Sequence, residues 1–122
     1  MKDGRKYTPS KSKNYENAVA IYAKQVMASD PKMLGPVSMT VRLCMKMPES
    51  WSKKRKDEAL SGKIAATKKP DCSNVIKGIE DAMNGVVYRD DSQIIEQIII
   101  KRYSAAPQAI ITVAEVSASP AP

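Results

Sequence analysis

The stretch VSMTVRLCMKM, residues 37–47, decides how the rest of the chain can be arranged. Its larger apolar side chains fall at every second position from Val37 to Met47, and Ser, Thr, Arg, Cys and Lys fall between them. A period of two over this length is typical of a half-buried strand, with one face on a core and the other turned away. Pro48 ends the pattern, because proline cannot donate to a strand ladder. We therefore expect a strand over 37–47.

Helical patterns lie on both sides of this strand. Before it, apolar residues spaced by three and four predict a helix from about Lys13 to Ala28, with Ser12 as its cap. After it, residues 51–60 have the charge density of an exposed helix, and Gly62 is a plausible terminator. Pro- and Gly-containing dipeptides between 30 and 36 predict a loop that joins the first helix to the strand.

A third helix is predicted after Pro70, because apolar residues between Val75 and Met83 share one face of a 3.6-residue period. Asn84-Gly85 should close it, since glycine readily adopts the left-handed conformation of a helix cap. Residues 94–103 and 109–116 read as two strands joined by a short turn, most simply an antiparallel hairpin.

The order of these elements predicts an α+β fold, a small mixed or antiparallel sheet packed with helices. We expect a single domain over residues 1–117, in which 1–12 form an extended arm, and a disordered tail over 118–122.

The charge of the chain indicates a polyanionic partner. The formal net charge is +7, and seven basic residues but only two acidic ones lie between Trp51 and Lys69. Such clustering is typical of a nucleic-acid binder. Two other readings stay open, a solvated basic helix face and a basic adaptor that binds an acidic protein.

Other features of the composition exclude some classes of protein. Two cysteines and no histidine are too few for a disulfide framework or a zinc site. No apolar run approaches the length of a membrane span or follows the N-terminus as a signal peptide would. We expect a reduced, cytoplasmic protein with no membrane partner.

Acidic residues flank the third helix in a pattern suited to phosphodiester chemistry. Asp71 lies at its start, and Asp90 and Asp91 lie in the turn after it. A helix packed back on the sheet could bring them together around Mg²⁺, which takes oxygen ligands. Lys77 could reach a phosphate oxygen or the leaving oxygen.

Each residue also has a structural alternative. Asp71 could be an N-cap of the helix. Asp81 lies four residues after Lys77, so the two could form an exposed helix pair. Asp90-Asp91 is also a common turn composition.

A family resemblance adds to this interpretation. The chain carries the pattern KKPDxxNxxKxxxDAMNG at 68–85 and YxDDSQI at 88–94, preceded by GRxYTP at 4–9 and PxSWSKK at 48–54. This set resembles the signature of RusA-type endodeoxyribonucleases, the phage and prophage Holliday junction resolvases, and it covers essentially the whole chain.

The resemblance implies a homodimeric, Mg²⁺-dependent enzyme that binds branched DNA and nicks two strands of a four-way junction, one per subunit. Mn²⁺ could replace Mg²⁺, and no small-molecule cofactor is implied. Asp71 and Asp91 match metal-binding and catalytic aspartates, with Asp90 as a further metal ligand, and Lys77 matches the catalytic lysine. The implied supporting residues are Asn74, Ser73 and Asp81, and the basic residues that would contact DNA are Lys53, Lys54, Arg55, Lys56, Lys68 and Lys69.

Two departures from the family pattern have consequences. The family commonly carries a second aspartate where this chain has Ser73, and serine lacks the negative charge that favours Mg²⁺. Either Asp90, Glu80 or a water compensates, or the protein is a weakened or inactive nuclease that still binds junctions. The family also usually carries a strand before the GRxYTP segment, so we expect a sheet that lacks this first strand.

Overall fold

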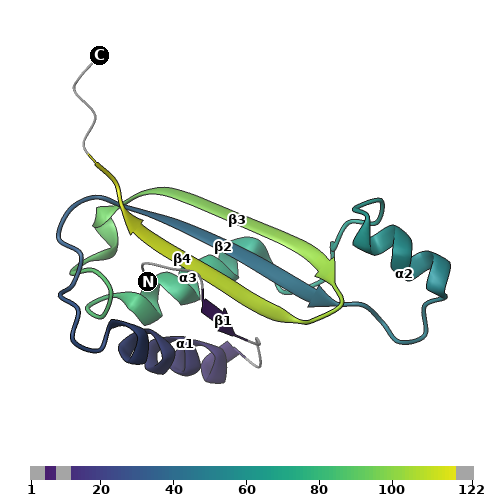
Figure 1. The fold of residues 1–122 in the computed structure, drawn as a ribbon, viewed down its shortest axis with the longest axis horizontal. Coiled ribbons are helices and arrows are strands. Elements are labelled where there is room, and N and C mark those ends of the chain that lie inside the picture. The colour runs from purple at the N-terminus through teal and green to yellow at the C-terminus, as the bar shows by residue number, and fades with distance from the viewer. Residues whose placement is uncertain (1–4, 8–11, 118–122) are drawn as a thin grey trace, which may run out of the picture.

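The computed structural model describes residues 5–7 and 12–117, with side chains from residue 16. The chain forms an α+β fold in which helices pack on one four-stranded mixed sheet of order β1-β4-β2-β3 (Figure 1). The elements are β1 (Arg5–Tyr7), α1 (Ser12–Met27), β2 (Val37–Lys46), α2 (Lys53–Leu60), α3 (Cys72–Met83), a 3₁₀ turn η1 (Asp91–Gln93), β3 (Ile94–Ser104) and β4 (Gln108–Glu115).

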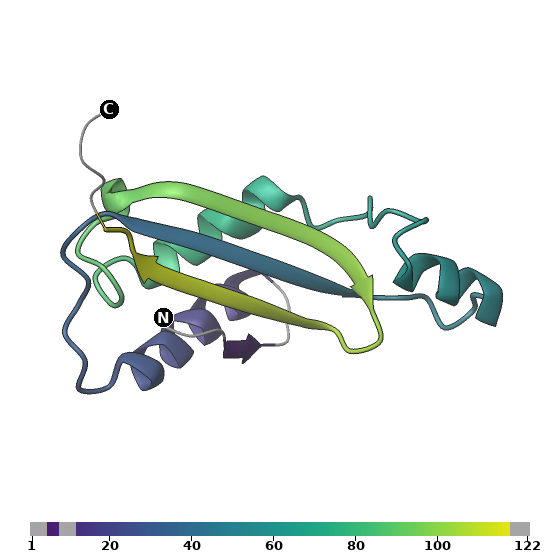
Figure 2. The ribbon, with the colours of Figure 1, turned by 45° about the horizontal axis from the view of Figure 1, so that its top comes forward.

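The strand expected over 37–47 is confirmed as β2, and it lies inside the sheet. It pairs in parallel with β3 and antiparallel with β4. Its alternating residues Val37, Met39, Val41 and Leu43 are at most 1% exposed. Helices α1 and α3 lie behind the sheet in Figure 2, on the face that these side chains cover.

The expected hairpin between the last two strands is wrong. β3 and β4 do not pair with each other, because β2 lies between them. The connection from Ser104 to Gln108 therefore passes the end of β2. A parallel pair such as β2 and β3 needs a long crossover, which the segment with α2 and α3 supplies.

Helix α3 lies against α1 and the sheet through one apolar face. Val75, Ile76, Ile79 and Met83 are buried in the core cluster, as the helical period predicted. Gly78 allows the two helices to approach, since a Cβ placed there would lie 3.0 Å from Oε1 of Glu16.

The predicted end of α3 at Asn84-Gly85 is confirmed. Gly85 has φ of +78°, the left-handed conformation that glycine adopts at little steric cost.

The structure describes only part of the expected N-terminal arm. Residues 5–7 form β1, a short strand paired antiparallel with β4. The expected absence of an earlier strand and the expected disordered tail fall outside the described residues. Among the helices within the described ranges, none has the length and apolar character needed to cross a membrane.

Candidate functional site

Asp71 occupies the N-cap position of α3 but does not cap it with its side chain. Its backbone is extended, with φ of −71° and ψ of 141°, and its carboxylate accepts no capping hydrogen bond. The residue is exposed. A capping aspartate would have its oxygens engaged by backbone amides. The carboxylate of Asp71 is instead available to an external ligand at the positive end of the helix dipole.

The residues before α3 are held by Lys101 of β3. Its Nζ donates to the carbonyl oxygens of Lys68, at 2.6 Å, and Pro70, at 2.9 Å. The Lys69–Pro70 peptide between these carbonyls is cis. Lys101 thus joins the start of α3 to the later half of β3 and positions Asp71 there.

The polar face of α3 is open to solvent. Asn74, Lys77 and Asp81 are exposed, as expected for the face opposite the apolar residues of the helix, and Ser73 is exposed as well. Among the described side chains, Lys77 and Asp81 form no ion pair, although they are four residues apart. The ammonium group of Lys77 is therefore not held by its own helix.

The turn after α3 is built around Asp90 and Gln93. A carboxylate oxygen of Asp90 accepts from the backbone N–H of Ser92 at 2.9 Å, and hydrogen bonds from Ser92 hold the pKa of Asp90 below its ordinary value. Oε1 of Gln93 accepts from the backbone N–H groups of Arg89 and Asp90, at 2.8 and 3.0 Å. These reciprocal bonds form a capping box.

Gln93 also ties this turn to the loop before β2. Its Nε2 donates to the carbonyl oxygens of Met33 and Gly35, both at 2.9 Å. Asp91 lies inside the turn and is exposed. The structure therefore holds the backbone of Asp91 firmly while leaving its side chain at the surface.

Tyr88 links the turn to the last turn of α3. Its hydroxyl donates to the carbonyl oxygen of Glu80 at 2.9 Å. Burial, followed by the negative charges of Glu80, Asp91, Asp81 and Asp90, raises the pKa of Tyr88. These four carboxylates therefore surround Tyr88 at the C-terminal end of α3.

The two ends of α3 keep Asp71 apart from Asp90 and Asp91. Asp71 precedes a helix of 12 residues and the two other aspartates follow it, so the helix alone separates them by about 18 Å. The sheet gives a similar value, since the seven residue steps from Ile94 to Lys101 span about 23 Å.

The expectation that α3 would bring these aspartates together within one chain is thus corrected. The helix does pack back on the sheet, but it runs antiparallel to β3. Asp71 therefore lies beside the later half of β3, and Asp90 and Asp91 lie at its beginning. Within the described residues there is also no group of three His, Cys, Asp or Glu side chains that could hold a metal ion. A single chain therefore does not assemble the expected metal site.

The basic residues gather at the end of the sheet where β3 finishes. Lys53, Lys54, Arg55 and Lys56 form the first turn of α2, which projects beyond the sheet (Figure 1). Ser52 caps this helix by accepting from the backbone N–H of Arg55 at 3.2 Å.

Trp51 fixes this helix to the sheet. Its ring meets that of Tyr103 edge to face, with centroids 5.2 Å apart, and the guanidinium of Arg55 lies 4.5 Å from the Trp51 ring centroid. Lys68 and Lys69 line a small hollow of about 150 Å³ on which Tyr103 also borders. The two basic segments expected to bind DNA therefore meet around Tyr103.

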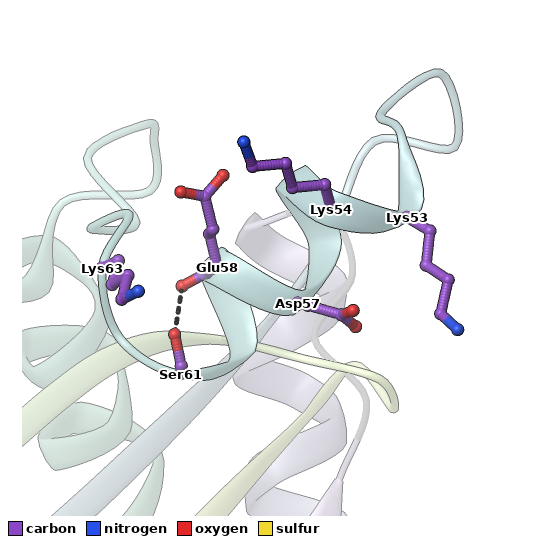
Figure 3. A pocket seen from close by; sticks show the side chains of 6 residues that line it. All are labelled: Lys53, Lys54, Asp57, Glu58, Ser61 and Lys63. Atoms are coloured by element: carbon purple, nitrogen blue, oxygen red, sulfur yellow. Dashed lines mark hydrogen bonds between the residues drawn. The ribbon is translucent and has the colours of Figure 1, made fainter.

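The surface of α2 carries both signs of charge (Figure 3). An open hollow of about 600 Å³ is lined by Lys53, Lys54, Asp57, Glu58, Ser61 and Lys63. The hydroxyl of Ser61 donates to the carbonyl oxygen of Glu58 at 3.0 Å and helps to end the helix. Lys53 and Lys54 point outward from the helix, where a phosphate backbone could reach them (Figure 3).

The motifs at 48–54 and 88–94 contain Trp51, Tyr88 and Gln93, but the sequence alone indicated no positioning role for them, and it did not single out Lys101. A lysine within the Ile-rich stretch 94–103 was the only available signal for Lys101. Gln93 had a clearer signal, because Asp90 and Gln93 have the spacing of a capping box.

Comparison with known proteins identifies the family. Residues 1–114 match the family described as endodeoxyribonuclease RusA. The chain is also 41% identical over 112 residues to the uncharacterized protein YqaN of Bacillus subtilis (strain 168), across 90% of this chain and 78% of that protein. The extent of the family match shows that this chain belongs to the RusA endodeoxyribonuclease family of Holliday junction resolvases.

Proposed function

We propose that this protein is a Mg²⁺-dependent, structure-selective endonuclease that resolves four-way DNA junctions by paired nicking. The observation that carries the proposal is the uncapped, exposed carboxylate of Asp71, which begins the helix that bears the family motif. Without a capping hydrogen bond this carboxylate stabilises the helix only through the helix dipole, so a ligand-binding role accounts for it better than capping does.

The residues of the chain would divide the work by position. Asp71 and Asp91, with Asp90 beside it, would hold the metal; because one chain keeps them at opposite ends of α3, they would meet between the two copies of the homodimer that the family resemblance implies. The charge of the metal would stabilise the phosphate oxygens. Lys77 is exposed on the same helix as Asp71 and free of Asp81, so its ammonium can approach a phosphate oxygen of the DNA. Asn74 and Ser73 lie on the same exposed face and would support Asp71.

The basic segments supply the binding surface. A four-way junction brings several phosphate backbones together, and contacts to phosphate position a protein without reading sequence. Lys53, Lys54, Lys68 and Lys69 are exposed and lie at the end of the sheet that also carries Asp71. Phosphate contacts from these lysines would lie near Asp71, the carboxylate that would help to hold the metal.

The test is cleavage of a synthetic four-way junction in the presence of Mg²⁺ or Mn²⁺. We expect paired nicks from the wild type and a loss of at least about 100-fold in Asp91→Asn and in Asp71→Asn. Asp57→Asn, an exposed aspartate on α2, is the matched control and should cut normally. A wild type that binds the junction but leaves it intact would overturn the proposal.

The second candidate is a junction-binding protein with a weakened or inactive metal site. The observation in its favour is Ser73, which puts a hydroxyl where the family commonly has a carboxylate. Ser73→Asp separates the two candidates. A large gain in cleavage with unchanged junction affinity would identify Ser73 as a defect, whereas equal cleavage by both proteins would show that the natural site is complete.

A further inference from the structure

Tyr103 borders two hollows at the end of β3. One is the hollow of about 150 Å³ that Lys68 and Lys69 also line, and the other, of about 300 Å³, lies between the end of α2 and β3. We propose that the larger hollow receives one unpaired nucleobase from the branch point of the DNA, stacked against the ring of Tyr103. The inference rests on the proposed function for its ligand, a branched DNA, and its geometry comes from the hollow and the ring.

The larger hollow has an apolar side and a basic side. The end of α2 and the segment after it contribute apolar side chains, among them Leu60, which is 49% exposed. The end of β3 contributes Lys101, Arg102 and Tyr103. Pockets that hold small ligands begin at about 300 Å³ and combine apolar walls with a few polar groups. A nucleotide has the matching parts, a flat ring and an anionic phosphate.

The ring of Tyr103 is fixed and its hydroxyl is not engaged. Trp51 meets the ring edge to face, with centroids 5.2 Å apart, and Trp51 is itself covered by the guanidinium of Arg55 at 4.5 Å. Tyr103 is only half-buried, and within the described residues its hydroxyl makes no hydrogen bond. A fixed ring of this kind can stack on any base, and its hydroxyl can bond to the base edge.

The cations around Tyr103 are arranged to hold the phosphates beside such a base. Arg102 is exposed and forms no ion pair with any described side chain, whereas Nζ of Lys101 already donates to two backbone carbonyls. Lys68 and Lys69, in the smaller hollow, are exposed as well. Cations therefore border Tyr103 in both hollows, where the phosphates before and after an inserted base would lie.

Such a hollow selects branched DNA over an uninterrupted duplex. A base inside a duplex is paired and stacked, and extracting it costs free energy, whereas an unpaired base enters a pocket at the least cost. Phosphate contacts alone are available on any duplex. The hollow therefore adds a contact that only a branch point satisfies cheaply.

The first test compares affinities for a four-way junction and for a linear duplex of the same length, by fluorescence anisotropy without divalent metal. Tyr103→Leu removes the ring and should weaken junction binding about 5- to 150-fold, the range expected for one base stacked on one ring. Its duplex affinity should be unchanged. Tyr103→Phe keeps the ring and should retain most of the junction affinity. An equal loss on both DNAs in Tyr103→Leu would show that the ring only supports α2 and would overturn the inference.

Filling the hollow tests its volume while leaving Tyr103 in place. Ala65 lines the hollow and is exposed, so a larger side chain there extends into the hollow and not into the packed core. Ala65→Leu should lower junction affinity by at least about fivefold and leave duplex affinity unchanged. Ala114→Leu is the matched control, because Ala114 is exposed on β4 and pairs with Ser38 at the opposite end of β2 from the residue that pairs with Tyr103. Unchanged junction affinity in Ala65→Leu would exclude this hollow as the base site.

A photochemical cross-link locates the base directly. Junctions with 5-iodouracil at the branch point, or in the middle of one arm as a control, would be bound and irradiated. The base at the branch point should cross-link to Tyr103, identified by mass spectrometry of the digested complex, and the base in the arm should not. A branch-point cross-link to another residue would place the base elsewhere and overturn the inference.

These measurements omit the metal, so they separate the inference from the proposed function. Junction-selective losses in Tyr103→Leu and Ala65→Leu, with a wild type that does not cut, would support the base site and overturn the nuclease. Cleavage by the wild type, with no junction-selective loss in either variant, would overturn the base site and leave the nuclease standing.

Discussion

The carboxylates of the site differ in whether they accept hydrogen bonds from the protein's own backbone. Asp71 and Asp90 both precede a helical turn, but only Asp90 uses its carboxylate as a cap, bonded to the backbone of Ser92. The bonds from Ser92 stabilise the charged form of Asp90 and lower its pKa. Asp71 has no such engagement, so it is the better candidate to bind an external ligand.

Tyr88 provides a prediction at the residue scale. Tyr88→Phe removes the hydroxyl that donates to the Glu80 carbonyl within a buried site, and the free energy of unfolding should fall by about 1–2 kcal/mol at neutral pH. Urea unfolding monitored by circular dichroism measures this change. Tyr22→Phe is the control, because the Tyr22 hydroxyl makes no hydrogen bond within the described residues.

The pH dependence of stability in the wild type and in Tyr88→Phe tests whether the Tyr88 hydroxyl is the source of the difference. The pKa of Tyr88 is raised in the folded state above the ordinary value of 10.0, so the unfolded chain loses the tyrosine proton first. The stabilisation by Tyr88 is complete below pH 10 and decreases as the pH rises above it. The difference in stability between wild type and Tyr88→Phe should therefore narrow above pH 10, and a constant difference would contradict the assignment.

At the scale of elements, α2 and α3 have different roles. The apolar face of helix α3 packs in the core, and this packing sets the orientation of its polar face. Helix α2 buries only Ala59 and is held to the end of β3 through the contact of Trp51 with Tyr103. A helix that buries so little contributes mainly through its surface, which for α2 is basic in the first turn.

Neutralising that first turn tests its role in DNA binding. Lys53→Gln with Lys54→Gln should weaken junction binding, and the slope of log affinity against log salt should become shallower by about 0.9 for each phosphate that the variant no longer neutralises. Fluorescence anisotropy at several salt concentrations measures both quantities. Lys24→Gln with Lys32→Gln, two exposed lysines outside the basic segments, should leave the slope unchanged.

At the scale of the whole molecule, β3 leaves a long edge of the sheet open among the described strands. The sheet ends on one side at the short strand β1 and on the other at the long strand β3. The polar residues of the candidate site lie at both ends of that long edge. Function at this scale is therefore expected to depend on the number of copies present.

A charge on this edge tests whether the homodimer implied by the family resemblance forms through β3. Ile98→Lys places an ammonium group where a second strand would pair, as natural edge strands do to prevent association, and Ile98 is already 48% exposed. We expect a folded monomer by light scattering, with junction cleavage lost. Ile21→Lys, on α1 and 58% exposed in the wild type, should remain a dimer. A dimer that persists in Ile98→Lys would show that the copies meet elsewhere.

The sequence was sufficient to predict the elements and the local placement of most site residues. The alternation in 37–47 predicted β2, and the apolar period after Pro70 predicted both the buried face of α3 and the exposure of Asn74, Lys77 and Asp81. These features depend on neighbours within a few residues, so periodicity reveals them. The hairpin prediction was wrong because strand order depends on contacts between residues far apart in the chain.

By itself, the sequence determined the α+β composition, the basic segments and the motif that identifies the family, since each is written in short stretches of residues. Only the tertiary structure decided that β2 separates β3 from β4 and that α3 runs antiparallel to β3. The physical reason is that a helix is a rigid spacer of fixed rise, so it can bury its apolar face correctly and still hold the acids at its two ends about 18 Å apart.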